Sequence, residues 1–201
     1  RFDDVCVAQV TTAGMEALIE PMLEALDEVL SPRAVVLRND APSRALEGLD
    51  NYVRAGRGEI PSRIAIEENG ARYFGDLAGG QKTGWYYDQR EHRAFMAGLA
   101  KGRSVLDAYC YAGGFAVLAA KNGAKETVGI ATSQRALSLA EEAAAANKAA
   151  CSFLKADVFE ELERLIVAKQ TFDIVIADPP PFVKARKDLE PGARAYRKLA
   201  R

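Results

Sequence analysis

The sequence predicts an α/β protein in which a small α+β domain precedes a doubly wound parallel sheet. Three observations carry this prediction. From Ser104 onward, short apolar runs alternate with helical segments, which is typical of parallel βαβ units. Acidic residues follow three of these runs, at Asp107, Asp157 and Asp178. Earlier in the chain, an Asn-Gly pair separates two alternating segments and predicts a β-hairpin.

The composition is that of a globular protein with reduced thiols. Hydrophobic residues make up 49% of the 201 residues, and no apolar run approaches the roughly 20 residues of a membrane span. Three widely spaced cysteines and one histidine predict neither a disulfide framework nor a metal site. We therefore expect a cytoplasmic protein without a membrane partner. The net charge of −1 argues against a protein that coats nucleic acid over its whole surface.

The amino-terminal part begins with a predicted strand at 4–10. Apolar residues then recur at helical spacing from Gly14 to Val29, which predicts one amphipathic helix bent at Pro21. A second strand is expected from Ala34 to Leu37. The segment that follows, up to Pro61, is punctuated by Gly, Pro, Asn and Asp, and we interpret it as an irregular connection.

The predicted hairpin closes the small domain. Its strands are expected at 62–68 and 71–77, joined by Asn69-Gly70 in a type I′ turn. The small domain is therefore predicted to span residues 1–77, and the larger domain residues 78–201.

A chemically dense segment opens the larger domain. Residues 79–90 contain three glycines, a lysine, a threonine, three adjacent aromatic residues and Asp88-Gln89-Arg90. Asp88 is expected to cap a helix beginning near Gln89. Gln89 and Arg90, in the first turn of that helix, could face a ligand.

The remaining elements follow in order. Strands are expected at 104–108, 127–130, 152–155 and 172–177, and helices begin near Gly113, after a cap at Ser133, and at Val158. Ligands of such sheets bind beyond the carboxyl ends of the strands, where the three acidic residues are predicted to lie.

The turn after the first of these strands has the chemistry of a ligand site. Gly113 and Gly114 let the backbone approach a ligand closely, and the helix that follows offers unpaired N–H donors. The dinucleotide pattern G-x-G-x-x-G is absent. An acid at the strand end with Gly-Gly shortly after it is instead the pattern of S-adenosylmethionine (SAM) methyltransferases. An ordinary βα turn whose glycines solve packing is the alternative.

Four motifs together resemble one family. They are Gly80-Gln81-Lys82-Thr83-Gly84-Trp85-Tyr86, Asp88-Gln89-Arg90, Asp107-Ala108-Tyr109-Cys110-Tyr111-Ala112-Gly113-Gly114-Phe115 and Asp178-Pro179-Pro180-Pro181-Phe182. With them the chain resembles the class I SAM-dependent ribosomal RNA large-subunit cytosine-C5 methyltransferases that carry a PUA domain. The likeness covers the central domain and the amino-terminal part of the Rossmann-like catalytic domain.

This resemblance implies SAM as the cofactor and 23S ribosomal RNA as the substrate. It places Asp107 near the methionine end of SAM and Asp157 at the adenine amino group. It puts the target base beside Asp178, Pro179, Pro180 and Phe182. The residues that it implies for the cofactor pocket are Gln81, Lys82, Thr83, Gln89, Arg90, Asp107, Tyr109, Gly113, Gly114, Phe115, Asp157 and Asp178. Each acid also has a simpler reading as a loop or cap residue.

The sequence departs from the family pattern at two places. The acid that would bind the ribose hydroxyls, about 20 residues after the glycine turn, is replaced by Ala131. The sheet is also expected to be incomplete at its carboxyl end, and the nucleophilic cysteine that the family uses is absent from these residues. Neither Cys6, Cys110 nor Cys151 replaces it convincingly, since C5 of cytosine becomes reactive only after a thiolate has added to C6.

Several readings and partners stay open. The alternatives to cytosine-C5 methylation are a SAM- or RNA-binding module without turnover and an amino-group methyltransferase of the N6-adenine type. A nicotinamide dehydrogenase is the least favoured alternative. An open edge at 174–176 would favour homo-oligomers. Residues 184–201 hold seven basic residues against Asp188 and Glu190, which predicts either a solvated helix face or a phosphate-contacting patch.

Overall fold

The computed structural model of the protein describes residues 1–80 and 83–200 and divides the chain into two compact units. The units comprise Arg1–Ile66 with Phe74–Tyr87, and Glu67–Tyr73 with Asp88–Arg201. The hairpin contributes residues to both of them. The predicted domain boundary after Leu77 stays a prediction, because compactness does not show which parts of the chain fold independently.

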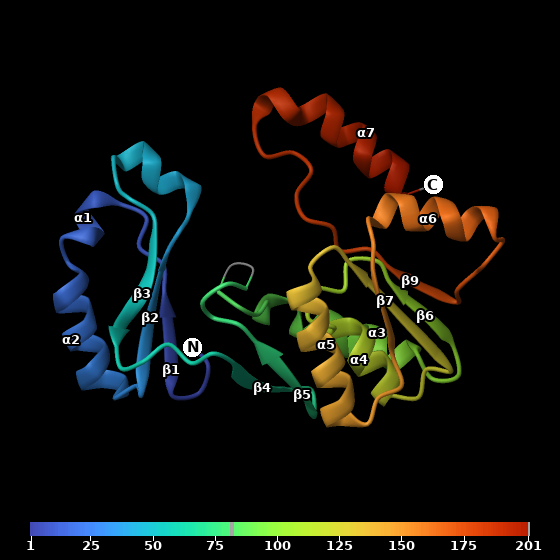
Figure 1. The fold of residues 1–201 in the computed structure, drawn as a ribbon, viewed down its shortest axis with the longest axis horizontal. Coiled ribbons are helices and arrows are strands. Elements are labelled where there is room, and N and C mark those ends of the chain that lie inside the picture. Colours follow the sequence, from blue (N-terminus) through green and yellow to red (C-terminus); the bar gives the residue numbers. More distant parts are fainter. Residues whose placement is uncertain (81–82, 201) are drawn as a thin grey trace. The chain divides into compact units, whose positions relative to one another are not determined.

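The first unit is built on a three-stranded sheet in the order β1-β2-β3 (Figure 1). Its strands are β1 (Val5–Ala8), β2 (Ala34–Asn39) and β3 (Tyr52–Arg57). β1 runs parallel to β2, and β3 runs antiparallel to it. The helix α2 (Ile19–Leu30) places its completely buried Leu23 in one core cluster with Val35 and Leu37 of the central strand. Burial of this apolar stripe stabilises the unit.

The single bent helix predicted from Gly14 to Val29 is wrong. The structure has a short helix α1 (Ala13–Glu16), and α2 begins separately at Ile19. Pro21 is the third residue of α2, where a backbone N–H would have no acceptor within the helix. The proline therefore fits the start of a straight helix and causes no bend in one.

The irregular connection predicted between Arg38 and Pro61 is also wrong. It contains the 3₁₀ helix η1 (Pro42–Glu47) and the strand β3. Gly56 lies within β3, and a Cβ there would come 2.8 Å from Cδ2 of Leu23. The glycine that resembles a loop signal is instead needed because α2 approaches the strand closely.

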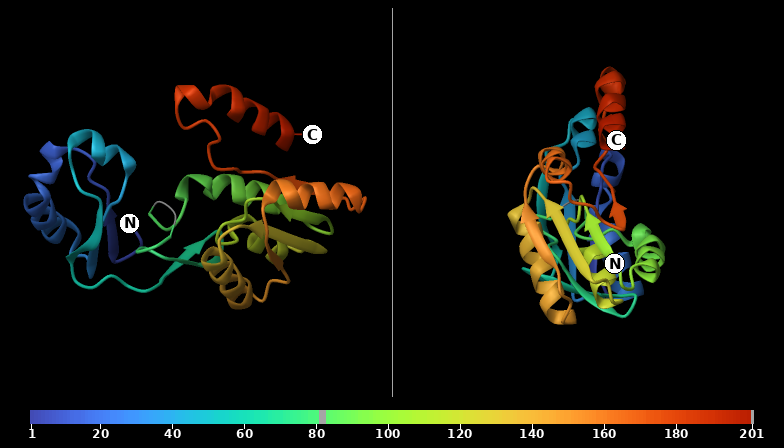
Figure 2. Two further views of the ribbon diagram at one scale, coloured as in Figure 1. Left: turned by 45° about the horizontal axis from the view of Figure 1, so that its top comes forward. Right: turned by 90° about the vertical axis from the view of Figure 1, so that its right-hand side faces the viewer.

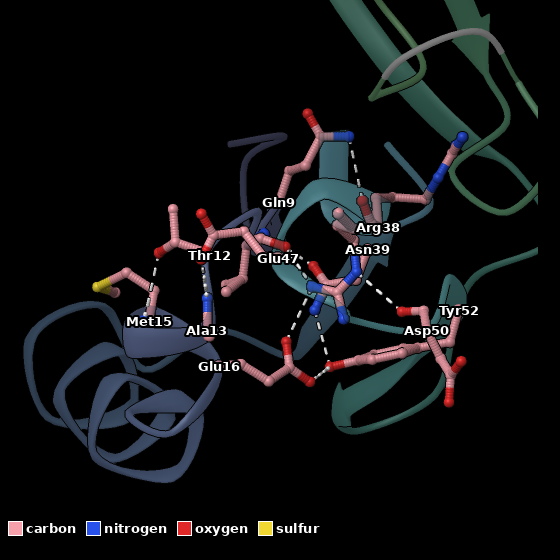
Figure 3. A network of polar contacts seen from close by, with 12 residues as sticks. Gln9, Thr12, Ala13, Met15, Glu16, Arg38, Asn39, Glu47, Asp50 and Tyr52 are labelled. Carbon is pink, nitrogen blue, oxygen red and sulfur yellow. Dashed lines mark hydrogen bonds and ion pairs between the residues drawn. The ribbon is translucent and has the colours of Figure 1, made fainter. Parts of the chain in front are cut away.

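A buried arginine lies at the centre of a polar network in the first unit, part of which Figure 3 shows. Arg44 is 1% exposed. It donates hydrogen bonds to Glu16 (2.9 Å), to the Asp50 carbonyl (2.9 Å) and to the Val10 carbonyl. The Tyr52 hydroxyl donates to Glu16 at 2.7 Å, and the Arg44 guanidinium stacks 5.1 Å from the Tyr52 ring centre. This network joins α1, η1 and β3.

The predicted hairpin is confirmed. Its strands are β4 (Ile64–Glu68) and β5 (Ala71–Gly75). Asn69 and Gly70 have φ values of 52° and 72°, as a type I′ turn requires.

The second unit contains a four-stranded parallel sheet in the order β8-β7-β6-β9, which confirms the predicted α/β fold. The strands are β6 (Ser104–Asp107), β7 (Glu126–Ala131), β8 (Ser152–Lys155) and β9 (Ile174–Ile176). β6 is central and fully buried. β9 lies at the predicted edge, where Val175 is 54% exposed.

Helices cover both faces of this sheet (Figures 1 and 2). The helical segments from Tyr87 onward are η2 (Tyr87–Gln89), α3 (Arg90–Leu99), α4 (Gly114–Lys121), α5 (Gln134–Asn147), α6 (Val158–Val167), η3 (Arg186–Asp188) and α7 (Leu189–Leu199), of which η3 and α7 do not lie on the sheet. Val105 of β6 packs in a cluster with residues of α3 and α4, whereas the adjacent Leu106 packs with residues of α6. Successive side chains of a strand point to opposite faces, so α6 lies opposite α3 and α4.

Two predicted helix caps have different outcomes. Ser133 caps α5 and accepts a hydrogen bond from the Ala136 N–H at 3.3 Å, as expected. The cap predicted at Asp88 is wrong, because this residue lies within η2 and the cap position of α3 is Gln89. No helix among residues 1–80 and 83–200 is long and apolar enough to cross a membrane.

Candidate functional site

The predicted ligand turn begins where the central strand β6 ends. Tyr111 and Gly113 adopt positive φ values of 47° and 77°, and α4 starts at the next residue. A Cβ on Gly113 would lie 2.9 Å from the Cβ of Ala140 in α5. Gly113 is therefore required both by its backbone conformation and by the close approach of α5. This packing agrees with the alternative that the glycines only allow close packing of the turn. The argument for a ligand therefore depends on the polar groups of the turn.

Asp107 is the most unusual of those polar groups. Its carboxylate is 1% exposed, and Oδ2 accepts a hydrogen bond from the Ala116 N–H of α4 at 3.1 Å. Oδ1 has no hydrogen-bond partner among the described residues. Such an atom is costly to bury because it has lost its hydration without replacement.

Burial raises the pKa of Asp107 to about 7. The Ala116 N–H lowers this pKa, and the negative charge of Asp178 raises it further. The Tyr109 N–H and the charge of Arg93 lower it, although the Tyr109 N–H makes no hydrogen bond to Oδ1. A carboxylate with a free oxygen in this setting suits a cationic ligand group.

All three predicted acids lie at the carboxyl ends of parallel strands, as expected. Asp157 follows β8 and caps α6 through hydrogen bonds from the N–H groups of Phe159 (2.9 Å) and Glu160 (3.2 Å). Both bonds use the same oxygen, Oδ1, so the cap does not engage the second oxygen.

Tyr109 presents a second buried polar atom without a partner. Its hydroxyl is buried and has no hydrogen-bond partner among the described residues. Burial raises the pKa of Tyr109, and the charge of Asp157 raises it further. The hydroxyl is therefore a neutral donor and acceptor near the acid at the end of β8.

Asp178 is linked to the start of α3. The Gln89 side-chain amide donates to Asp178 Oδ2 at 3.2 Å, and its Oε1 lies 2.7 Å from Nδ1 of His92. Since the amide oxygen can only accept, Nδ1 of His92 carries the proton in this arrangement. Gln89 and Asp178 are thus in direct contact, and their role in a cofactor pocket stays a prediction.

A buried ion pair beside the glycine turn was not predicted. Glu68 of β4 accepts a hydrogen bond from Nε of Arg93 at 2.7 Å, and the two side chains are 0% and 4% exposed. The Arg93 guanidinium lies 5.9 Å from the ring centre of Phe115. Arg90, predicted to face the cofactor, also lies 3.5 Å from Glu68. The signal was present, because Glu68 continues the buried alternation of Ile64 and Ile66.

The segment after Asp178 is held by aromatic contacts. The Phe182 ring lies 5.7 Å from the Phe159 ring centre and 4.7 Å from that of Tyr196. Pro179 is half-buried and Pro180 is exposed. The role predicted for Pro179, Pro180 and Phe182 toward a target base stays a prediction.

Three further residues predicted for the cofactor pocket stay predictions. Gln81 and Lys82 lie outside the described residues, and Thr83 belongs to the first unit.

The cysteines are unsuited to act as free nucleophiles. Burial raises the pKa of the Cys110 thiol, and it raises that of Cys151 to about 11. Cys6 is buried in the core of the first unit. Since the thiolate is the reactive form, Cys110 and Cys151 are held in the unreactive state.

The residues present fit a cofactor with SAM chemistry. Asp107 Oδ1 and the Tyr109 hydroxyl are buried atoms that lack partners among the described residues, and both lie at the carboxyl edge of the sheet. SAM carries an ammonium group, ribose hydroxyls and an adenine amino group, all of which can donate to such oxygens. At the end of β7, Ala131 presents no acceptor for the ribose.

Comparisons with known proteins agree with this chemistry. Residues 49–201 match the family model described as S-adenosylmethionine-dependent methyltransferase. Two relatives named Ribosomal RNA large subunit methyltransferase I come from Tolumonas auensis and Aliivibrio fischeri. They are 36% identical over 204 residues and 37% identical over 203 residues. Each alignment covers 99% of this chain and 51% of the relative, so the chain spans about half the length of these relatives.

A solved structure shows the same fold with a ligand. It is SMU.776, assigned as a methyltransferase and complexed with SAH, and it matches with a TM-score of 0.77 and 25% identity. The match covers 92% of this chain and 48% of that one. The family match over most of the chain and the residues of the glycine turn lead to one conclusion. The chain belongs to the S-adenosylmethionine-dependent methyltransferase family.

Proposed function

We propose that the protein methylates C5 of a cytosine in 23S ribosomal RNA with SAM as the methyl donor. The observation that carries this proposal is the relationship to ribosomal RNA large subunit methyltransferase I proteins, which extends over 99% of the chain. The cytosine-C5 specificity and a PUA domain in the intact protein rest on the motif resemblance. A cytoplasmic location and ribosomal RNA as the partner follow from the same relationship.

The chain's own residues would hold the cofactor at the carboxyl edge of the sheet. Asp107 would accept from the ammonium group of SAM, because its Oδ1 is buried without another partner among the described residues. Asp157 would use its second oxygen for the adenine amino group, and Tyr109 would bond nearby. Gln89 would fix the orientation of Asp178 beside the target base. When bound, SAM supplies an electrophilic methyl group.

Methylation at C5 also needs a thiolate that adds to C6 of the cytosine. Neither Cys110 nor Cys151 is suited, because burial raises the pKa of both thiols. The thiolate of the proposed reaction is therefore supplied by neither of these two cysteines. After methyl transfer, a general base would remove the C5 proton, and β-elimination would restore the C5–C6 double bond and break the C6–S bond to expel the thiolate.

Two alternatives make different predictions. Ala131 and the unreactive cysteines favour a SAM- and RNA-binding module without turnover. An N6-adenine type enzyme would stack an aromatic ring directly after Asp-Pro-Pro on the target base. Here Pro181 intervenes, and Phe182 packs between Phe159 and Tyr196, which disfavours that reading. Homo-oligomerisation through the exposed edge of β9 is a further expectation of ours.

The test is incubation of the intact, full-length protein with isotope-labelled SAM and 23S ribosomal RNA, followed by nucleoside analysis. We expect 5-methylcytidine, and we expect Asp107→Asn to reduce its formation by about 10- to 100-fold at limiting SAM. Formation of N6-methyladenosine would replace the proposal by the amino-group alternative. Binding of both ligands without any methylated nucleoside would support the module without turnover.

A further inference from the structure

The helix α7 carries positive charge that the cofactor site does not use. Residues 184–200 contain six basic residues and two acidic residues, which gives this segment a net charge of +4, whereas the whole chain carries −1. The six basic residues are Lys184, Arg186, Lys187, Arg194, Arg197 and Lys198. All six are exposed. This terminal segment thus carries a local excess of positive charge in a chain whose net charge is slightly negative.

Most of this charge is not neutralised within the protein. Lys198 pairs with Glu163 of α6 at 2.6 Å, and Arg194 lies 3.9 Å from Glu190 with both side chains largely exposed. Within the part of the chain that the structure describes, no carboxylate pairs with Arg186, Lys187 or Arg197. If these charges served only to solvate the helix, acidic partners at i,i+4 spacing would make the helix more stable.

The charged helix is packed directly onto the segment after Asp178. Gly192 of α7 is buried, and a Cβ there would lie 2.9 Å from the Phe182 carbonyl oxygen. The Phe182 N–H donates to the Tyr196 hydroxyl at 3.3 Å, and the two rings lie 4.7 Å apart. The absence of a side chain on Gly192 is what allows this close contact between helix and loop.

The contact with Phe182 places the basic surface next to the proposed target-base site. Figure 1 shows α7 following the loop after β9 and returning toward α6. The N-cap residue of α6 is Asp157. Phosphate contacts from Lys and Arg fix the position of a nucleic acid without reading its sequence. Groups beside the base pocket would therefore hold the phosphates that flank a base inserted there.

From these observations, and on the basis of the function proposed above, we propose that η3 and α7 form a phosphate-binding surface for the RNA substrate. Arg186, Lys187 and Arg197 are its principal contacts. The loop from Asp178 to Phe182 connects this surface to the methyl-transfer site. The surface positions the RNA and takes no part in the chemistry.

The test compares two triple variants of the protein in RNA binding at several salt concentrations. The first is Arg186→Gln, Lys187→Gln and Arg197→Gln. The matched control is Lys101→Gln, Arg103→Gln and Lys169→Gln, which removes three exposed basic residues around the amino edge of the same sheet. Binding of a 23S ribosomal RNA fragment is measured by fluorescence anisotropy. SAM affinity, measured by calorimetry, reports whether the fold is intact.

For the first variant, we expect the slope of log K against log salt to fall by about 2 to 3, since each lost phosphate contact contributes roughly 0.7–0.9. KM for RNA should rise at least about tenfold at physiological salt, with kcat and SAM affinity within about twofold of the parent. The control should keep the parent slope. Equal slopes for the two variants would overturn the proposal, and would leave an acidic protein as the better partner for this surface.

If the triple variant does not fold, the three single variants carry the same test, with an expected change in slope of roughly 0.7–0.9 each. RNA binding is measured separately from methylation, so the two proposals can fail independently. A parent protein that shows α7-dependent RNA binding but no 5-methylcytidine would refute the proposed reaction and retain the surface.

Discussion

Two buried charges, one in each compact unit, differ in how completely the protein satisfies them. Arg44 in the first unit donates hydrogen bonds from Nε to the Asp50 carbonyl and from Nη1 to the Val10 carbonyl and Glu16. Asp107 in the second unit is buried to the same extent, yet Oδ1 has no partner among the described residues. A satisfied buried charge stabilises its surroundings, whereas an unsatisfied one sacrifices stability and is available to a ligand.

The largest effect is expected when the fully hydrogen-bonded residue of this comparison, Arg44, is replaced. Arg44→Met should lower the free energy of unfolding by about 3 kcal/mol, because it removes the donor to Oε2 of Glu16, to the buried Val10 carbonyl and to the Asp50 carbonyl. Urea denaturation measures this change. SAM affinity should stay within about twofold, since the ligand groups belong to the other unit.

The control for Arg44 is an exposed arginine in the same unit. Arg33 pairs with Asp4 at 2.9 Å, and both side chains are about half exposed. Solvent screening limits the loss from Arg33→Met to less than about 1 kcal/mol. Equal destabilisation by the two variants would show that the buried Arg44 network stabilises the protein no more than an exposed ion pair does.

The second prediction concerns the unsatisfied charge. Asp107→Asn should weaken SAM binding by about 10- to 100-fold, the range of a lost charge-assisted hydrogen bond. The same variant should not lower the free energy of unfolding at pH 8, because it removes a buried negative charge. Calorimetry and thermal unfolding measure the two quantities.

Asp173 provides the matched control at the other end of β6. Its carboxylate accepts from the Ser104 N–H (2.8 Å) and hydroxyl (2.9 Å) and pairs with Lys125 at 3.0 Å. Asp173→Asn should therefore reduce stability and leave SAM affinity unchanged. A stabilised Asp173→Asn, or a destabilised Asp107→Asn, would reverse the comparison.

The pH dependence of the two acids should also differ in sign. Because burial raises the pKa of Asp107 to about 7, the unfolded chain releases this proton at lower pH than the native protein. Stability from this group therefore falls as the pH rises from about 4 to 7. The Ser104 N–H lowers the pKa of Asp173 to about 2, and this acid stabilises the protein above pH 4 and loses its effect as the pH falls toward 2.

SAM affinity should rise with pH through the same range in which Asp107 ionises. The gain ends where an α-amino group itself loses its proton, at about 7.7–8.0. Asp107→Asn should remove the rise between pH 6 and 7. A parent protein whose SAM affinity does not change over that interval would contradict the assigned partner.

The smallest expected effect adds an acid where the family has one. Ala131→Asp should tighten SAM binding about tenfold or more, because a carboxylate at the end of β7 can accept from both ribose hydroxyls. Isothermal calorimetry measures this affinity. An unchanged value would mean that Thr132 or Ser133 already supplies the missing contact.

Much of the second unit was predictable because local pattern and packing agree there. The apolar strands, the helix start at the glycine turn and the Ser133 cap are all set within a few residues, and each was confirmed. In the first unit, β3 was missed because Gly56 looks like a loop residue but serves a contact with Leu23 from a distant helix. Tertiary contacts of this kind leave no mark on the local sequence.

The site shows the same division. The positions of the acids at the strand ends follow from topology. The hydrogen bond between Gln89 and Asp178 was not predicted. The pair of Glu68 and Arg93 joins the hairpin to α3, and only the burial alternation of β4 hinted at it. The packing of Phe182 against Tyr196 depends on α7, whose sequence indicates only charge and amphipathicity.

The strand order also determines when the turn after β6 can reach its native, buried conformation during folding. β6 pairs with β7 after one short connection, but its other neighbour, β9, lies much later in the chain. The Ser104 N–H bonds to Asp173, 69 residues away, and the Ala108 N–H bonds to the Ile176 carbonyl. Contacts between residues so far apart in sequence form slowly, because the chain loses the entropy of loop closure before the contacts stabilise it. Asp107 is therefore expected to remain hydrated until β9 docks, which makes its burial a late step of folding.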